Sequence, residues 1–219
     1  MPVDDTLYPV NLRVTGRPCL VVGGGRVAAD KAAGLLECGA VVHVVAPELG
    51  EDLAAMLAAA VAAPEGGDQL TWDQRPYRPA DLDGRMLVIT ATSSPATNHA
   101  VFLDAQRAGV LVNSADDPAN CTFTLPSRVR QGRLLVTFST GGHSPALATW
   151  LRRRFTSEFG PEYDRLIDVL ADAREEIRAE GRSTEGLDWQ GALDSGMLEL
   201  IREGRIAEAK ERLQACLSS

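Results

Sequence analysis

The sequence predicts an α/β fold with a parallel sheet, followed by a β-hairpin and a helical C-terminal region. Up to residue 115, short apolar runs alternate with helical patterns, an order typical of parallel sheets with crossover helices. Residues 121–140 then hold two strand-like runs without a helical pattern between them. From residue 145 onward the apolar residues recur mainly with helical spacing.

A glycine-rich turn follows the first core strand, predicted at 19–22, and precedes a helix predicted at 27–36. Gly23, Gly25 and Ala28 occupy the three small-residue positions of a dinucleotide-binding turn. The first permits the tight turn, the second lets a pyrophosphate approach the backbone, and the third packs helix on strand. A plain strand-to-helix connection is the alternative. The predicted cofactor contacts here are Gly23, Gly24, Gly25, Arg26 and Val27.

The second strand is predicted at 41–45 and ends at Pro47. Glu48 follows where the chain would pass the ribose of the cofactor. Enzymes that prefer NAD usually carry an acidic group about 20 residues beyond the glycines. Glu48 comes late for this role, and a surface glutamate is the alternative. We predict cofactor contacts at Pro47 and Glu48.

The other elements of the predicted sheet follow in order. They are a lead-in strand around 8–12, a helix at 51–63, strands at 71–77 and 86–92, a helix from 95 to 109 and a strand at 110–115. Ligands of parallel sheets lie beyond the carboxyl ends of the strands. We therefore expect Thr92 and Asn113 to line the cofactor crevice of a Rossmann-like domain.

Beyond the sheet, residues 121–129 and 133–140 predict a hairpin that turns at Gln131-Gly132. Ser144 and Pro145 suit the N-cap and the first position of a helix. Further helices are predicted at 162–180, 189–203 and 206–217.

Two adjacent carboxylates, Asp116 and Asp117, follow the strand at 110–115. A carboxylate at the end of a strand, beside a nicotinamide, is a candidate for proton transfer. An Asp-Pro turn that merely caps the strand is the alternative. The sequence contains no zinc-type ligand cluster and no Gly-x-Ser-x-Gly motif, so we expect no bound metal and no α/β-hydrolase.

The net charge of −8 argues against general nucleic-acid binding. Residues 114–155 nevertheless carry six basic and two acidic side chains, between two acidic segments. An anionic ligand is one explanation and a solvated surface is the other. The arginines that could bind carboxylates here are Arg128, Arg130, Arg133, Arg152 and Arg153.

Together these motifs resemble the precorrin-2 dehydrogenase/sirohydrochlorin ferrochelatase family, the siroheme-synthase module. The likeness covers residues 7–155 closely. The stretches that carry it are Tyr8-Pro-Val, Val21-Val-Gly-Gly-Gly-Arg-Val-Ala with Lys31, Val45-Ala-Pro, Ala91-Thr, Val112-Asn-Ser-Ala-Asp-Asp-Pro, Phe123 to Ser127, and Ser139-Thr-Gly-Gly-His-Ser-Pro-Ala-Leu-Ala with Leu151-Arg.

The resemblance implies NAD-dependent oxidation of precorrin-2 to sirohydrochlorin, often followed by insertion of Fe²⁺ to give siroheme. It also implies a homodimer with an NAD-binding Rossmann domain (1–113), a dimerisation and substrate region (114–150) and a helical domain (151–219). The essential aspartate of the family falls on Asp116. The implied tetrapyrrole-binding residues are Arg128, Ser139, Gly141, His143, Ser144, Arg152 and Arg153.

We expect a cytoplasmic protein. The four cysteines are scattered, no apolar run approaches the roughly 18 residues of a membrane span, and the N-terminus lacks the pattern of a signal peptide. A nucleotide- or redox-sensing Rossmann module without catalysis is the competing interpretation.

Overall fold

A computed structural model describes residues 6–62, 69–115 and 117–218. The chain divides into two compact units. The first comprises the chain up to Leu125 together with Gly141–His143, and the second comprises Pro126–Thr140 and the chain from Ser144 onward. The division into three domains at 113 and 150 stays a prediction.

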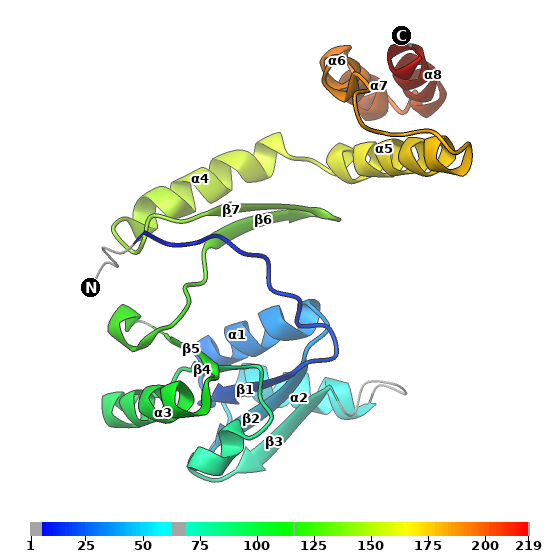
Figure 1. Cartoon of the computed structure of the whole chain (residues 1–219). Helices are drawn as coiled ribbons and strands as arrows, with labels where there is room; N and C mark the ends of the chain where they lie inside the picture. The colour runs from blue at the N-terminus through cyan, green and yellow to red at the C-terminus, as the bar shows by residue number, and fades with distance from the viewer. Residues whose placement is uncertain (1–5, 63–68, 116, 219) are drawn as a thin grey trace. The chain divides into compact units, whose positions relative to one another are not determined.

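The first unit is built on a five-stranded parallel sheet with the order β3-β2-β1-β4-β5 (Figure 1). This order reverses between β1 and β4, which is where open α/β sheets bind their ligands. The strands are β1 Pro18–Val22, β2 Val41–Ala46, β3 Leu70–Gln74, β4 Leu87–Thr90 and β5 Leu111–Ser114. The helices are α1 Arg26–Glu37, α2 Glu51–Ala62 and α3 Pro95–Ala108, with short 3₁₀ turns η1 Pro79–Leu82 and η2 Pro118–Asn120.

Both faces of this sheet are buried, which explains the nearly continuous apolar runs of the central strands. Val21 and Val44 belong to the core that includes residues of α1, whereas Leu20 and Val45 belong to the core that includes residues of α3. Successive side chains of a strand point to opposite faces, so one short run supplies both cores. The predicted Rossmann-like sheet is confirmed.

Two of the predicted strands are wrong. The lead-in segment forms no strand, and Tyr8 and Val10 are 88% and 70% exposed. Alternation alone does not make a strand when no neighbour supplies a ladder. The first hairpin strand begins at Ser127 rather than at 121, because Thr122 is bound to β5: its backbone N–H donates to the Val112 carbonyl at 2.8 Å.

The second unit contains an antiparallel hairpin, β6 Ser127–Gln131 and β7 Leu134–Phe138, and five helices. Gly132, with φ +53°, and Arg133 form the hairpin turn, one residue later than predicted. The helices are α4 Pro145–Glu158, α5 Glu162–Ala179, α6 Trp189–Asp194, α7 Met197–Arg202 and α8 Ile206–Leu217.

Helices α5 to α8 share one apolar core, centred on Met197, Ile201 and Leu213. The single helix predicted at 189–203 is wrong, since Ser195 and Gly196 separate α6 from α7. Gly196 has φ +88°, a left-handed conformation that a continuing helix cannot contain. The cap predicted for α4 is confirmed: the Ser144 hydroxyl accepts a hydrogen bond from the Leu147 N–H at 3.2 Å.

Candidate active site

The first glycine of the turn after β1 has a backbone that only glycine adopts easily. Gly23 has φ +127°, and a Cβ there would lie 2.6 Å from the Ala91 carbonyl oxygen. Its N–H donates to the Val45 carbonyl at 3.0 Å. Gly23 therefore lets the chain turn sharply from β1 toward α1 while it contacts the residues at the ends of β2 and β4, as the motif predicts.

The next two glycines differ from each other in their surroundings. A Cβ on Gly24 would lie 1.9 Å from the Glu48 carbonyl oxygen, and the Gly24 carbonyl accepts a hydrogen bond from Gly50 at 2.8 Å. Gly24 is thus required for packing against the loop after β2. By contrast, no atom lies within 4 Å of a Cβ built on Gly25. The space that this Cβ would fill is open.

Gly25 is also the N-cap of α1, and no side chain caps the helix there. The first backbone N–H groups of a helix have no partner within the helix. Together with the positive end of the helix dipole, they form a natural phosphate site. Ala28 in the first turn is fully buried, which brings α1 close to the sheet. The residues present therefore fit the pyrophosphate of a dinucleotide.

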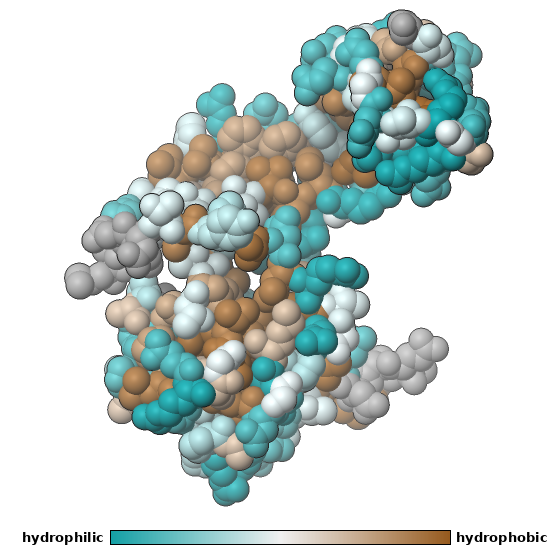
Figure 2. Space-filling model, in the orientation of Figure 1, coloured by the Kyte–Doolittle hydropathy of each residue, from teal (hydrophilic) through white to brown (hydrophobic). Residues whose placement is uncertain are grey.

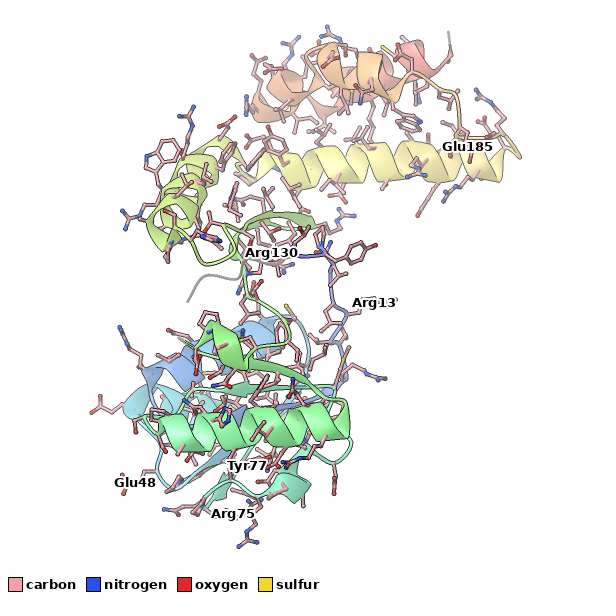
Figure 3. All side chains as sticks on the ribbon, turned by 60° about the vertical axis from the view of Figure 1, so that its left-hand side comes forward. Arg13, Glu48, Arg75, Tyr77, Arg130 and Glu185 are labelled. Atoms are coloured by element: carbon pink, nitrogen blue, oxygen red, sulfur yellow. The ribbon has the colours of Figure 1, made fainter. Side chains whose placement is uncertain are left out.

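The other predicted contacts around this loop lie on its surface. Arg26 and Val27 are exposed in the first turn of α1. Glu48 lines a shallow groove with Leu57, Val61 and Trp72, and Figure 3 labels it at the periphery of the first unit. The cofactor contacts of Arg26, Val27, Pro47 and Glu48 stay predictions.

Asn98 organises the carboxyl end of β4. Its side-chain oxygen accepts hydrogen bonds from the hydroxyls of Thr90 and Thr92 at 2.6 and 2.7 Å, and its amide donates to the Thr92 carbonyl at 3.1 Å. Asn98 is only 8% exposed. Sequence reasoning missed it, although a polar residue on the inner face of α3, one turn after the Ser94 cap, is a usable signal.

Asn113 has a similar function at the end of β5. Its amide donates to the Phe123 carbonyl at 2.9 Å, and the residue is 7% exposed. Thr92 and Asn113 thus both follow strands at the edge predicted to hold the cofactor, but their side chains bind neighbouring protein groups. Their cofactor contacts stay predictions.

The turn after β5 carries the predicted catalytic carboxylate. Asp116 itself lies outside the described residues. The Cys121 thiol holds the turn from inside. Its Sγ accepts from the Ser114 N–H at 3.1 Å, and its single S–H has two acceptors within reach, the carbonyls of Ser114 and Asp117 at 3.4 and 3.3 Å. Burial raises the pKa of the Cys121 thiol, so the sulfur keeps the proton that it donates.

A charged cluster that the sequence analysis did not predict fastens the crossover between β3 and β4. Arg75 donates to both carboxylate oxygens of Asp81 at 2.6 and 2.9 Å, and to Asp73 at 2.7 Å. Asp81 is 8% exposed. The Tyr77 hydroxyl donates to Asp104 on α3 at 3.2 Å; Figure 3 labels both Arg75 and Tyr77 on this crossover. These charges stabilise the fold.

The cationic residues of the second unit fall into two groups. Arg133 is held by Asp164 and Asp168 on α5, so it supports the fold rather than a ligand site. Arg152 and Arg153 are exposed on α4; within the described part of the second unit, neither makes an ion pair. Arg128 is exposed on β6.

The loop before α4 contains the remaining predicted substrate residues. Ser139 and His143 are exposed, whereas Gly141 and Ser144 are half-buried. The Ser144 N–H donates to the Thr140 hydroxyl at 3.1 Å, which fixes the start of α4. Over residues 6–62, 69–115 and 117–218, no group of three or more His, Cys, Asp or Glu side chains could hold a metal ion.

The comparisons agree with this geometry. Residues 10–127 match the family described as "Putative NAD(P)-binding", and the chain belongs to this family. The predicted NAD cofactor agrees with this family description.

Among individual proteins, the chain is similar to siroheme synthases. It is 36% identical over 214 residues to that of Nitrosomonas eutropha, covering 97% of this chain and 44% of the relative. It is 33% identical over 208 residues to that of Photorhabdus laumondii, covering 94% and 43%. The chain thus spans less than half the length of these relatives. The similarity confirms the resemblance that the motifs predicted.

A solved structure, "SirC, precorrin-2 dehydrogenase", shares the fold with a TM-score of 0.64 and 24% sequence identity. The match covers 97% of this chain and 100% of that one. The predicted order of an α/β sheet, a hairpin and a helical region is therefore that of a known fold.

Proposed function

We propose that this chain is an NAD-dependent dehydrogenase that oxidises precorrin-2 to sirohydrochlorin in siroheme biosynthesis. The observation that carries the proposal is the open surface in front of Gly25, at the start of α1 and beside the switch point of the sheet. The siroheme-synthase relatives support the substrate. NAD⁺, when bound, accepts the hydride that the oxidation releases.

Oxidation of precorrin-2 releases one hydride and one proton, so the site also needs a proton acceptor. We assign this role to Asp116, which follows β5 in the sequence. General-base assistance is typically worth about 10²–10⁴ in rate. Asp117 is a poor candidate because its carboxylate already accepts a hydrogen bond from the Asn120 amide at 2.6 Å.

The test is turnover of precorrin-2 with NAD⁺, followed by absorbance. Asp116→Asn should lose about 10²–10⁴ in kcat while it still binds NAD⁺. Asp117→Asn keeps an acceptor oxygen for Asn120, so it should lose much less. If the wild-type protein binds NAD⁺ but does not turn over precorrin-2, the chain is a nucleotide- or redox-sensing module.

For the substrate we propose a cationic site on the second unit. Precorrin-2 is fringed with carboxylates, and the guanidinium groups of Arg152 and Arg153 are exposed and without ion pairs among the described residues. Forked arginine contacts suit carboxylates. Within the second unit, the other residues proposed to contact the tetrapyrrole are Arg128, Ser139 and Ser144. The contacts of Gly141 and His143, which belong to the first unit, stay predictions.

We also propose that the active form is a homodimer. None of the residues of α4 is buried, and Leu147 and Trp150 are 47% and 54% exposed. Figure 2 shows apolar residues gathered over this helix. Within β6 and β7 only Val129 is buried, and a two-stranded hairpin is at best marginally stable alone. A second copy would cover these faces.

Sedimentation equilibrium should give twice the chain mass, and Trp150→Glu should shift the protein toward monomers.

We also propose Fe²⁺ as a second substrate. The pyrrole N–H protons must leave as the metal enters, and the proton acceptor assigned to the oxidation can take them. Adding Fe²⁺ after complete oxidation should produce the siroheme spectrum if this chain performs both steps.

We place the protein in the cytoplasm. The four cysteines, all of them among the described residues, form no disulfide, as expected in a reducing compartment. In the described part of the chain, every helix is too short or too polar to cross a membrane.

A further inference from the structure

A buried amide near the start of α3 holds the backbone that follows β4. Asn98 is 8% exposed. Its Oδ1 accepts a hydrogen bond from the Thr92 backbone N–H at 3.2 Å, and its Nδ2 donates to the Thr92 carbonyl at 3.1 Å. The reverse amide orientation would turn the NH₂ group toward the Thr92 N–H, so only one orientation satisfies both contacts. Asn98 therefore fixes Thr92 through the backbone on both sides of its Cα.

The peptide bond between Ala91 and Thr92 also forms one side of the glycine turn. In a trans peptide the N–H and the carbonyl point in opposite directions, so the contact of the Thr92 N–H with Asn98 also directs the Ala91 carbonyl. A Cβ built on Gly23 would lie 2.6 Å from that carbonyl oxygen and 3.2 Å from the Thr92 nitrogen. The peptide bond that Asn98 holds is therefore the one against which Gly23 turns.

The other side of the turn is β2, where the Val45 carbonyl accepts a hydrogen bond from the Gly23 N–H at 3.0 Å. Two residues later, Gly25 begins α1 as its N-cap, and the first N–H groups of the helix have no partner within it. Their direction follows from the backbone of the turn, because each residue contributes only two soft dihedral angles. A pyrophosphate site at the start of α1 therefore depends on both sides of the turn.

We propose that Asn98 is a positioning residue for NAD⁺, which holds the Ala91–Thr92 peptide bond so that the glycine turn keeps the conformation that binds the pyrophosphate. This inference rests on the NAD-dependent function proposed above. Asn98 is buried and its amide is bound at both ends, so it acts through the peptide bond rather than by contact with the cofactor. Without Asn98, the turn must be ordered when the cofactor binds, and this ordering lowers the affinity.

The test measures three properties of the full chain: the Kd for NAD⁺ by calorimetry, the Tm, and the amide exchange of Gly23 without cofactor. Asn98→Ala should raise the Kd about 10-fold or more, the equivalent of one charged hydrogen bond to a phosphate. The entropy of binding should become less favourable, because the turn is then ordered by the cofactor. The Gly23 N–H should exchange on the order of 10-fold faster than in wild type.

The matched control is Val101→Ala, which truncates a fully buried apolar side chain about one turn further along α3. Because valine cannot form the hydrogen bonds of Asn98, this variant destabilises the same unit through packing alone. It should lower the Tm but leave both the Kd for NAD⁺ and the exchange of Gly23 within about twofold of wild type.

A second variant acts on Asn98 from a position that the cofactor cannot reach. The Thr90 hydroxyl donates to the Asn98 Oδ1 at 2.6 Å, and Thr90 is fully buried. Thr90→Val keeps the shape of the side chain and removes this hydrogen bond. It should raise the Kd for NAD⁺ about 3- to 10-fold, the equivalent of one neutral hydrogen bond.

The outcomes separate this inference from the proposed function. If wild type and Asn98→Ala bind NAD⁺ equally well, the positioning role is refuted and the dehydrogenase function stands. Equal losses of affinity in Asn98→Ala and Val101→Ala would assign the effect to stability and would also refute positioning. If the wild-type protein binds no NAD⁺, the proposed function and the positioning role fail together. Should Asn98→Ala not fold, Thr90→Val decides the question, and a Kd within twofold of wild type overturns the inference.

Discussion

Replacing Gly25 with alanine separates cofactor binding from folding. The residue has φ −79°, which any residue adopts, and its Cβ would meet no protein atom within 4 Å. The folded protein should therefore change little, with a stability difference within about 1 kcal/mol, because alanine is only a poorer N-cap than glycine. This corresponds to a Tm shift of about 2–4 °C.

The same Cβ would occupy the surface that the pyrophosphate approaches. If it displaces the phosphate from one backbone N–H, the lost charged hydrogen bond costs about 1.5–3 kcal/mol. The Kd for NAD⁺ should then rise roughly 10- to 150-fold. Calorimetric titration with NAD⁺ measures this change directly, and Gly25→Val should enlarge it.

Gly24→Ala is the matched control. Its Cβ would lie 1.9 Å from the Glu48 carbonyl, so the loop after β2 must move, at a cost of about 1–3 kcal/mol. Gly25→Ala should thus be stable but bind NAD⁺ weakly, whereas Gly24→Ala should be unstable. Unchanged NAD⁺ affinity in Gly25→Ala, with a Tm like that of wild type, would refute the assignment of this surface to the pyrophosphate.

Two further predictions concern the charged residues. Arg152→Ala and Arg153→Ala should each raise the KM for precorrin-2 roughly 10- to 150-fold, the equivalent of about 1.5–3 kcal/mol, if the contact is desolvated, and leave NAD⁺ affinity unchanged. The control is Arg154→Ala, since Arg154 lies over the Trp150 ring at 5.5 Å. Asp81→Asn should destabilise the protein by about 1.5–3 kcal/mol in thermal unfolding at neutral pH. Burial alone would raise the pKa of Asp81, but hydrogen bonds from Arg75 and the Arg78 backbone lower it below its usual value. This stabilisation is present above about pH 4, the pKa in the unfolded chain, and is lost as the pH falls further through the folded pKa. As the pH falls below about 4, Asp81→Asn should therefore lose less unfolding free energy than wild type does. Parallel plots of unfolding free energy against pH for the two proteins would contradict this explanation.

The parts of the fold that the sequence predicted well are those determined by neighbouring residues. A few consecutive residues determine each of these features: the Gly23 turn, the Ser144 cap and the buried apolar strands. The hairpin strand predicted to begin at residue 121 was wrong because residues 121–123 form part of a strand-like run but bind β5. Gly196 lies inside an apparently continuous helical pattern, yet its left-handed backbone ends the helix.

The polar contacts of the site were less predictable because their partners are far away in the chain. Asn120 is an ordinary turn residue until α3 brings His99, 21 positions earlier, to its side chain. Asn98 is likewise unremarkable until its position beside the end of β4 is known. In each case the chemistry of the residue was visible and its partner was not.

The Asn98 contacts also bear on the order in which the first unit folds. They join residues six and eight positions apart, so closing this loop costs little chain entropy. Pairing β1 with β4 instead joins Cys19 to Leu87, a distant contact that is slow to form. The β4–α3 corner is therefore able to form early, so the carboxyl end of β4 is in place before β1 pairs with β4. In an amide-exchange experiment during refolding, this corner should gain protection ahead of β1.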